Sequence, residues 1–117
     1  MYTKEQAKAK MQRFVNYENN LRIWNDLGKP NIIIFDDLTQ EHPFGWVFYW
    51  QVENVKDDIS NALAGNGPII IEKETLNVYC MMTAISVEEN IELYKSDKNK
   101  LLQIEEDEDG FFDPVNL

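Results

Sequence analysis

Residues 45–52, with the sequence GWVFYWQV, constrain the fold of this chain more than any other stretch. Side chains of an extended strand alternate between its two faces, so Trp46, Phe48 and Trp50 share one face. Rings of this size need a deep core or a helix packed above them. The intervening face is also largely apolar, which favours a central strand over one at a sheet edge. We therefore predict that Trp46, Phe48 and Trp50 belong to the core; the alternative is that an exposed tryptophan among acids is a contact for a partner.

Other segments carry clear strand or helix signals. Strands are predicted, from β-branched and aromatic content, at residues 32–36, 68–73, 77–83 and 101–104. Thr3 and Gln6 match a capping box that opens a helix ending near residues 19–20, and Ser86 and Glu89 match a second box. The connecting segments are a hairpin turn at 74–77, a connection at 37–44, and either a short helix or a packed loop at 54–64.

These elements predict an α+β fold. Consecutive strands joined by short turns pair in an antiparallel manner, so we expect a mainly antiparallel sheet of about four to five strands. The N-terminal helix and the second helix, near residues 86–95, are expected to pack on one face of that sheet. A length of 117 residues suits a single core, which we assign to residues 1–104. Residues 105–117 are predicted to form an acidic C-terminal tail.

The chain is strongly acidic, with a formal net charge of −10, and this charge is uneven. Residues 1–31 carry a net charge of +3 and residues 32–117 carry −13. An acidic body repels nucleic acid, so no nucleic-acid partner is expected. The same charge attracts basic proteins and speeds their encounter, although solubility alone is an alternative explanation.

Several features predict a cytoplasmic protein without a membrane partner. No apolar run approaches the ~20 residues of a membrane span, and the first residues lack the apolar core of a signal peptide. A single cysteine, Cys80, excludes an internal disulfide and a multi-cysteine metal site. The sequence leaves open whether the chain is a monomer or a homodimer.

The stretch GNGP at residues 65–68 invites comparison with a phosphate-binding loop. It lacks the lysine and the Ser/Thr of that motif, and a strand follows where a helix N-terminus is required. Glycine and asparagine tolerate positive φ, and proline sets φ at the start of a strand. We therefore interpret Gly65, Gly67 and Pro68 as a structural turn.

The sequence offers no convincing catalytic pair. His42 lies in a polar connection beside a proline, where an exposed histidine without a role is expected. Cys80 lies within a strand among apolar residues, where a buried and inert thiol is expected. We predict that the protein is not an enzyme and has no catalytic residues and no cofactor.

Two acidic groups deserve comparison with metal sites. Asp36 and Asp37 are adjacent at the end of a predicted strand, and adjacent carboxylates in a strand point to opposite faces and do not easily share an ion. Glu105, Asp107 and Asp109 match positions 1, 3 and 5 of a calcium loop, but the loop's essential acidic ligands at its first and last positions do not fit. We predict no metal site; weak divalent-cation binding is the alternative.

Three blocks of the sequence carry a resemblance. They are residues 44–50 (FGWVFYW), 63–75 (LAGNGPIIIEKET) and 86–94 (SVEENIELY). Together they resemble the immunity protein 35 domain family of bacterial polymorphic toxin systems, over roughly residues 5–95. The family has a glycine after Thr75, where this chain has Leu76-Asn77, and we expect Asn77 to accept the positive φ.

The resemblance implies a small α+β cytoplasmic protein that binds and neutralises a cognate toxin, in competition between bacteria. The acidic body agrees with this function, because an inhibitor of a basic toxin needs complementary charge. The alternative is a small stress-related, chaperone-like binding protein. We place the partner contact on acidic groups flanking the sheet, namely Asp36, Asp37, Glu41, Glu72, Glu74, Glu105, Glu106 and Asp107.

Overall fold

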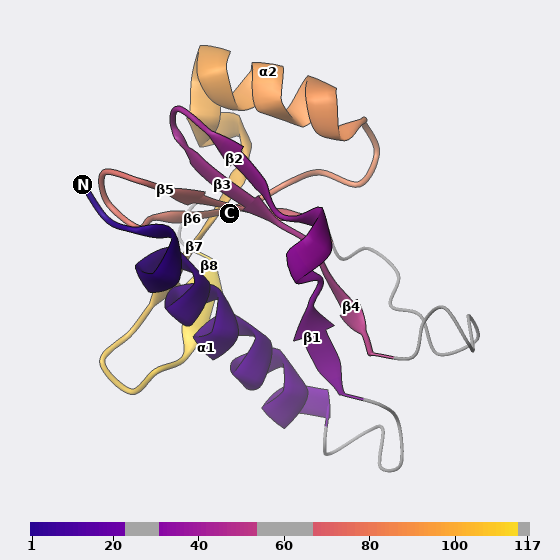
Figure 1. The fold of residues 1–117 in the computed structure, drawn as a ribbon, viewed down its shortest axis with the longest axis vertical. Coiled ribbons are helices and arrows are strands. Elements are labelled where there is room, and N and C mark those ends of the chain that lie inside the picture. The colour runs from indigo at the N-terminus through magenta and orange to yellow at the C-terminus, as the bar shows by residue number, and fades with distance from the viewer. Residues whose placement is uncertain (23–30, 54–66, 115–117) are drawn as a thin grey trace.

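The computed structural model describes residues 1–22, 31–53 and 67–114 (Figure 1). Its helices are α1 (Lys4–Arg22) and α2 (Val87–Asp97), with short 3-10 helices η1 (Asp36–Leu38) and η3 (Lys98–Lys100). Its strands are β1 (Ile32–Ile34), β2 (Gln40–His42), β3 (Gly45–Phe48), β4 (Trp50–Val52), β5 (Ile69–Glu72), β6 (Val78–Cys80), β7 (Leu102–Glu106) and β8 (Phe112–Pro114). The predicted α+β class with a mainly antiparallel sheet is confirmed.

The strands within the described ranges form two sheets where we predicted one. The main sheet has six strands in the order β2-β3-β5-β6-β7-β8, and β1 and β4 form a separate two-stranded ribbon. β3 lies between β2 and β5, so its predicted central position is confirmed. The predicted number of strands is too low, partly because residues 37–44 contain most of η1 and all of β2 where we predicted only a connection.

The continuous strand predicted around Tyr49 is wrong, because it breaks at this residue and its two halves enter different sheets. The carbonyl of Tyr49 accepts a hydrogen bond from the backbone N–H of Phe35 at 2.8 Å, which extends the pairing of β4 with β1. Trp46, Phe48 and Trp50 nevertheless share one face, as predicted. Trp46 and Phe48 are buried in one core cluster, and the half-buried Trp50 packs against it.

The two helices cover opposite faces of the main sheet, whereas we predicted that both pack on one face (Figure 1). The cause is the alternation along β5, where Ile69 and Ile71 face α1 and Ile70 faces α2. The core on the α1 side contains Ala7, Met11, Phe14, Val15, Ile32, Ile34, Trp46, Phe48, Val52, Ile69, Ile71, Val78 and Phe112. The core on the α2 side contains Val47, Ile70, Tyr79, Met81, Ile91, Tyr94 and Leu101.

Both helices begin at the predicted caps. The backbone N–H of Gln6 donates to Thr3 Oγ1 at 3.2 Å, and the backbone N–H of Thr3 donates to Gln6 Oε1 at 2.9 Å. Ser86 Oγ accepts from the backbone N–H of Glu89 at 3.1 Å. Each cap satisfies N–H groups that have no partner within the helix itself.

Helix α1 continues to Arg22, past the predicted end near residues 19–20. Asn19 does not end the helix but connects it to β1: its side-chain amide accepts from the backbone N–H of Ile32 at 2.8 Å and donates to the carbonyl of Ile32 at 3.0 Å. Asn31 and Phe35 direct their backbone groups toward β4, so those of Ile32 point to the other edge of β1. Asn19 therefore holds α1 along this edge.

The described part of the predicted acidic tail belongs to the main sheet. Glu105 and Glu106 lie in β7, which pairs with β8. In the loop between these strands, Asp107 Oδ1 accepts hydrogen bonds from the backbone N–H groups of Asp109 and Phe111, both at 2.9 Å. The acidic run was misleading because its charges face outward while the following Phe112 is buried in the core.

Close backbone packing explains two glycines. A Cβ on Gly67 would lie 2.0 Å from the carbonyl oxygen of Met81, and one on Gly45 would lie 2.1 Å from that of Ile71. Gly67 and Pro68 directly precede β5, which begins at Ile69 and not at residue 68 as predicted. Gly65 and the predicted segment 54–64 lie outside the described residues, so the predicted turn at 65–68 stays a prediction. In the β5–β6 hairpin, the positive φ of +58° falls on Leu76 and not on Asn77.

Candidate functional site

A buried carboxylate lies between the main sheet and α2. Glu72, at the end of β5, is 6% exposed and accepts three side-chain hydrogen bonds. Its donors are the hydroxyl of Tyr94 at 2.5 Å, the ammonium of Lys98 at 2.8 Å and the hydroxyl of Thr75 at 2.7 Å. A carboxylate with these partners is satisfied within the protein, so Glu72 does not belong to an exposed contact surface as we predicted.

The surroundings of Glu72 determine its protonation. Burial by itself raises the pKa of this carboxyl, but the hydrogen bonds from Lys98, Tyr94 and Thr75 outweigh burial and lower the pKa below its ordinary value. Burial and the hydrogen bond to Glu72 raise the pKa of Tyr94, so its phenol stays a donor at neutral pH. The negative charge of Glu72 is thus balanced by Lys98, and its hydrogen bond with Tyr94 links β5 to α2.

Aromatic rings extend this link toward the β2–β3 hairpin. The ring of Phe44 lies 4.6 Å from that of Tyr94, and the ring of His42 stacks on Phe44 at 5.0 Å. His42 Nε2 lies 3.0 Å from Gln40 Oε1. The half-buried His42 is therefore packed and hydrogen-bonded, and not exposed as we predicted.

His42 and Cys80 lie far apart in the fold. They belong to β2 and β6, which are three strand spacings, or about 14 Å, apart in the main sheet. They also contribute to opposite faces, because Cys80 packs against the core on the α1 side. Burial raises the pKa of the Cys80 thiol, which disfavours the thiolate. The geometry does not join these two residues into a nucleophile–base pair.

The acidic groups compared with metal sites have other roles in the structure. The Asp107 carboxylate holds the β7–β8 loop through two backbone N–H groups, and Asp36 forms an ion pair with Lys8 at 2.9 Å. Within the described ranges, no group of three or more His, Cys, Asp or Glu side chains could hold a metal ion. None of the helices in these ranges is long and apolar enough to cross a membrane.

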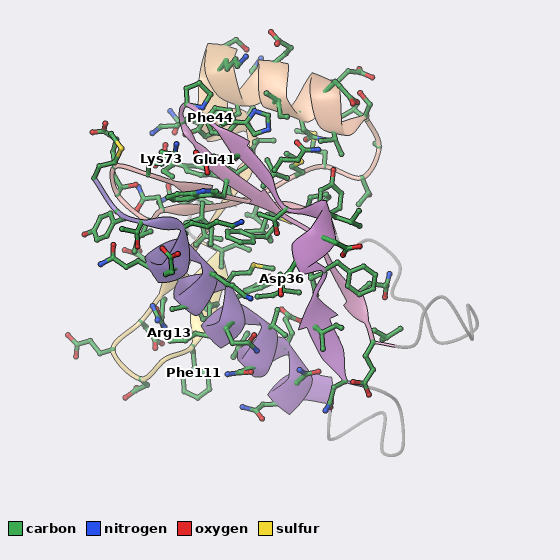
Figure 2. All side chains as sticks on the ribbon, in the orientation of Figure 1. Arg13, Asp36, Glu41, Phe44, Lys73 and Phe111 are labelled. Atoms are coloured by element: carbon green, nitrogen blue, oxygen red, sulfur yellow. The ribbon has the colours of Figure 1, made fainter. Side chains whose placement is uncertain are left out.

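The predicted contact acids do not form a single surface. Glu41 lies on β2, at one edge of the main sheet, and Glu105 lies on β7, four strand spacings or about 19 Å away. In Figure 2, Glu41 and Lys73 lie well apart from Arg13, whose side chain pairs with Glu106 of β7. Glu74, in the β5–β6 turn, is exposed as predicted.

Some of these acids are neutralised by cations of the chain itself. Glu106 accepts two hydrogen bonds from Arg13, at 2.8 and 3.0 Å, and these bonds raise the pKa of the arginine. Glu41 lies 3.5 Å from Lys73, whose ammonium also lies 5.3 Å from the centre of the Trp46 ring. Both pairs reduce the negative charge that these acids offer to a partner.

The β1–β4 ribbon combines acidic side chains with apolar surface. A hollow of about 370 Å³ lies along the β1–β4 ribbon. Among the described residues, Ile33, Ile34, Phe35, Asp36, Asp37 and Glu53 line it. Sequence reasoning found Asp36 and Asp37 but missed Glu53, which reaches the hollow because β4 pairs with β1. The backbone N–H of Glu53 donates to the carbonyl of Asn31 at 2.9 Å.

Sequence reasoning also missed a second acidic hollow, along the outer side of α2. Glu88, Glu89 and Glu92 line it together with Ile85 and Leu93. Their spacing along a predicted helix was a usable signal, because residues three and four positions apart share one helix face. The first two of these acids lie in the first turn, where negative charge stabilises a helix.

No protein-family model matches the chain, and no match is found among curated proteins or solved structures. The three blocks that carry the family resemblance meet in the fold. Phe44 comes from the first block, Glu72 from the second and Tyr94 from the third, and they are in contact beneath α2. In this structure Phe44, Glu72 and Tyr94 pack α2 against the main sheet, so their role is structural.

Proposed function

We propose that this chain is a cytoplasmic immunity protein that neutralises a basic protein toxin by forming a stoichiometric complex with it. The observation that carries the proposal is the acidic surface. Of the eight predicted contact acids, six are exposed, on a chain with a net charge of −10. The resemblance to the immunity protein 35 domain family supports the same function.

A protein that neutralises a toxin by binding needs a surface whose shape and charge complement the toxin. It does not need to catalyse a reaction. Excess negative charge on one partner steers a positive partner toward it and raises the association rate. An inhibitor that acts by occupying its target needs a slow dissociation rate, which apolar contacts at the centre of the interface supply. An acidic surface with local apolar hollows fits both requirements.

The test uses the product of the toxin gene expected next to the gene for this chain, in a catalytically inactive form. We expect one-to-one stoichiometry by light scattering and an association rate at least about tenfold lower in 0.5 M than in 0.05 M salt. Absence of a complex contradicts the proposed function. A complex whose association does not respond to salt contradicts the electrostatic part only.

A chaperone-like binding protein is the second candidate. The exposed apolar side chains Leu38, Met82 and Phe111 favour it, because such proteins hold unfolded chains through apolar surface. This candidate requires that the protein suppress the aggregation of several unrelated clients at near-stoichiometric ratios. Suppression of aggregation for unrelated clients, without a single tight partner, would favour it over the immunity function.

A further inference from the structure

The β1–β4 ribbon presents apolar side chains on a face that the core does not use. Ile32 and Ile34 of β1 are 2% and 7% exposed because they pack into the core on the α1 side. Ile33, between them, points to the opposite face and is 39% exposed. Leu38, in the following 3-10 helix η1, is 47% exposed. Ile33 and Leu38 therefore leave apolar surface exposed near the hollow, which Ile33 also lines.

Three carboxylates, those of Asp36, Asp37 and Glu53, line the same hollow as Ile33. Asp36 is held by Lys8 at 2.9 Å, and Figure 2 shows Asp36 near α1, which carries that lysine. Asp37 and Glu53 are exposed, and neither forms an ion pair with another residue of the described ranges. Charges beside apolar walls interact more strongly with an incoming cation than charges in open water do.

We infer that the outer face of the β1–β4 ribbon is the docking surface for the partner protein. Its occupant is a segment that presents an apolar side chain flanked by lysine or arginine. The apolar side chain would enter the hollow beside Ile33, and the flanking cations would meet Asp37 and Glu53. This inference rests on the proposed function and adds to it the surface and the chemistry of the partner.

Charge complementarity selects this occupant. A second copy of the chain would bring the same carboxylates face to face, and like charges across an interface are strongly unfavourable. Two acids of the other acidic surfaces have roles within the protein. Glu89 belongs to the cap of α2, and Glu106 is paired with Arg13 at the far end of the main sheet. Asp37 and Glu53 have no such role among the described residues.

A defined probe tests the surface directly. The probe is a synthetic peptide of alternating lysine and leucine, titrated into the ¹⁵N-labelled full-length protein and followed by NMR. We expect saturable shifts of the backbone amides of residues 33–38 and 53. Control peptides replace leucine by serine, or lysine by glutamate, and should bind at least about tenfold more weakly. Shifts confined to another surface, or equal binding of the serine peptide, would overturn the inference.

Two matched double variants distinguish the effect of the acids at the proposed surface from the effect of the overall net charge on peptide binding. Asp37→Asn with Glu53→Gln is expected to weaken the probe at least about tenfold. Glu108→Gln with Asp109→Asn changes the net charge by the same amount on the exposed β7–β8 loop, and it should change the affinity less than about twofold. An equal effect of the two double variants would mean that only the overall charge matters.

A third variant predicts a change of opposite sign. Lys8→Gln removes the cation that neutralises Asp36, so the probe should bind about two- to fivefold more tightly. Damage to the fold would weaken binding in every variant, so this result distinguishes the docking surface from misfolding. Unchanged or weaker binding to a folded Lys8→Gln protein would contradict the place of Asp36 on the surface.

The toxin complex separates this inference from the proposed function. If the toxin binds and the Asp37→Asn, Glu53→Gln variant binds it equally well, the function stands and the docking surface is wrong. If no toxin binds but the peptide occupies residues 33–38 and 53, the surface stands as a site for basic apolar segments and the immunity function is wrong.

Discussion

Glutamates and aspartates are used in two opposite ways on the two sides of this molecule. Beneath α2, the carboxylate of Glu72 is buried and receives hydrogen bonds from Tyr94, Lys98 and Thr75. On the β1–β4 ribbon, Asp37 and Glu53 are exposed around an apolar hollow, without ion pairs to other described residues. The first arrangement holds the fold together, and the second contributes little to it. The side chains are chemically alike, so burial and partners alone separate the two roles.

The largest expected effect comes from removing the buried carboxylate. Glu72→Ala leaves the hydroxyl of Tyr94 and the ammonium of Lys98 without their acceptor, and we expect a loss of about 2–4 kcal/mol in the free energy of unfolding. Chemical denaturation measures this loss. The control Glu105→Ala, at an exposed position of β7, should cost less than about 0.5 kcal/mol. Equal losses in the two variants would mean that the burial and the partners of Glu72 add nothing to its contribution.

The pH dependence of stability should follow Glu72. Its pKa is lowered in the folded protein, so its contribution is fully present above the pKa of the unfolded chain and is lost as the pH falls through the folded pKa. We expect stability to decrease below about pH 4.5, the ordinary value for this side chain. In Glu72→Gln this part of the decrease should be absent. An unchanged acid profile in Glu72→Gln would show that other carboxyls govern the transition.

A smaller effect is expected at the tyrosine that donates to this carboxylate. Tyr94→Phe keeps the ring contacts with Phe44 and Tyr79 but removes one charge-assisted hydrogen bond. We expect a loss of about 1–2 kcal/mol, measured by thermal or urea unfolding. Tyr17→Phe is the control, because its hydroxyl has no hydrogen-bond partner among the described residues. A loss at Tyr17 as large as that at Tyr94 would count against a special role for the hydroxyl.

The smallest effect on stability is expected on the ribbon. Asp37→Asn with Glu53→Gln should change the free energy of unfolding by less than about 0.5 kcal/mol in either direction, because exposed charges contribute little. The same measurement series as for Glu72 provides the comparison. A loss above about 1 kcal/mol would show that these acids have a structural role, and it would weaken the case for a docking surface.

Local signals in the sequence predicted the parts of the fold that depend on neighbouring residues. The caps at Thr3 and Ser86 and the β5–β6 hairpin follow from short-range patterns. The break at Tyr49 does not, because alternation of side chains continues through it and only the pairing of β4 with β1 reveals it. Strand pairing is decided by distant residues, which one sequence does not display.

The candidate site was predictable only in part for the same reason. Asp36 and Asp37 are conspicuous acids in the sequence, but Glu53 joins them through strand pairing. Glu72 looked like a surface acid because a strand residue next to a turn is usually exposed. Its burial depends on Tyr94 and Lys98, which lie more than twenty residues away in the chain.

The contact between Asn19 and β1 has a further consequence. An unpaired strand edge invites edge-to-edge association with other copies of the same chain, and such association leads to aggregates. The Asn19 amide occupies both backbone groups of Ile32 on that edge, in the way that a neighbouring strand would. At Ile32, one side chain of α1 therefore takes the place that a strand of another copy would need for edge-to-edge pairing.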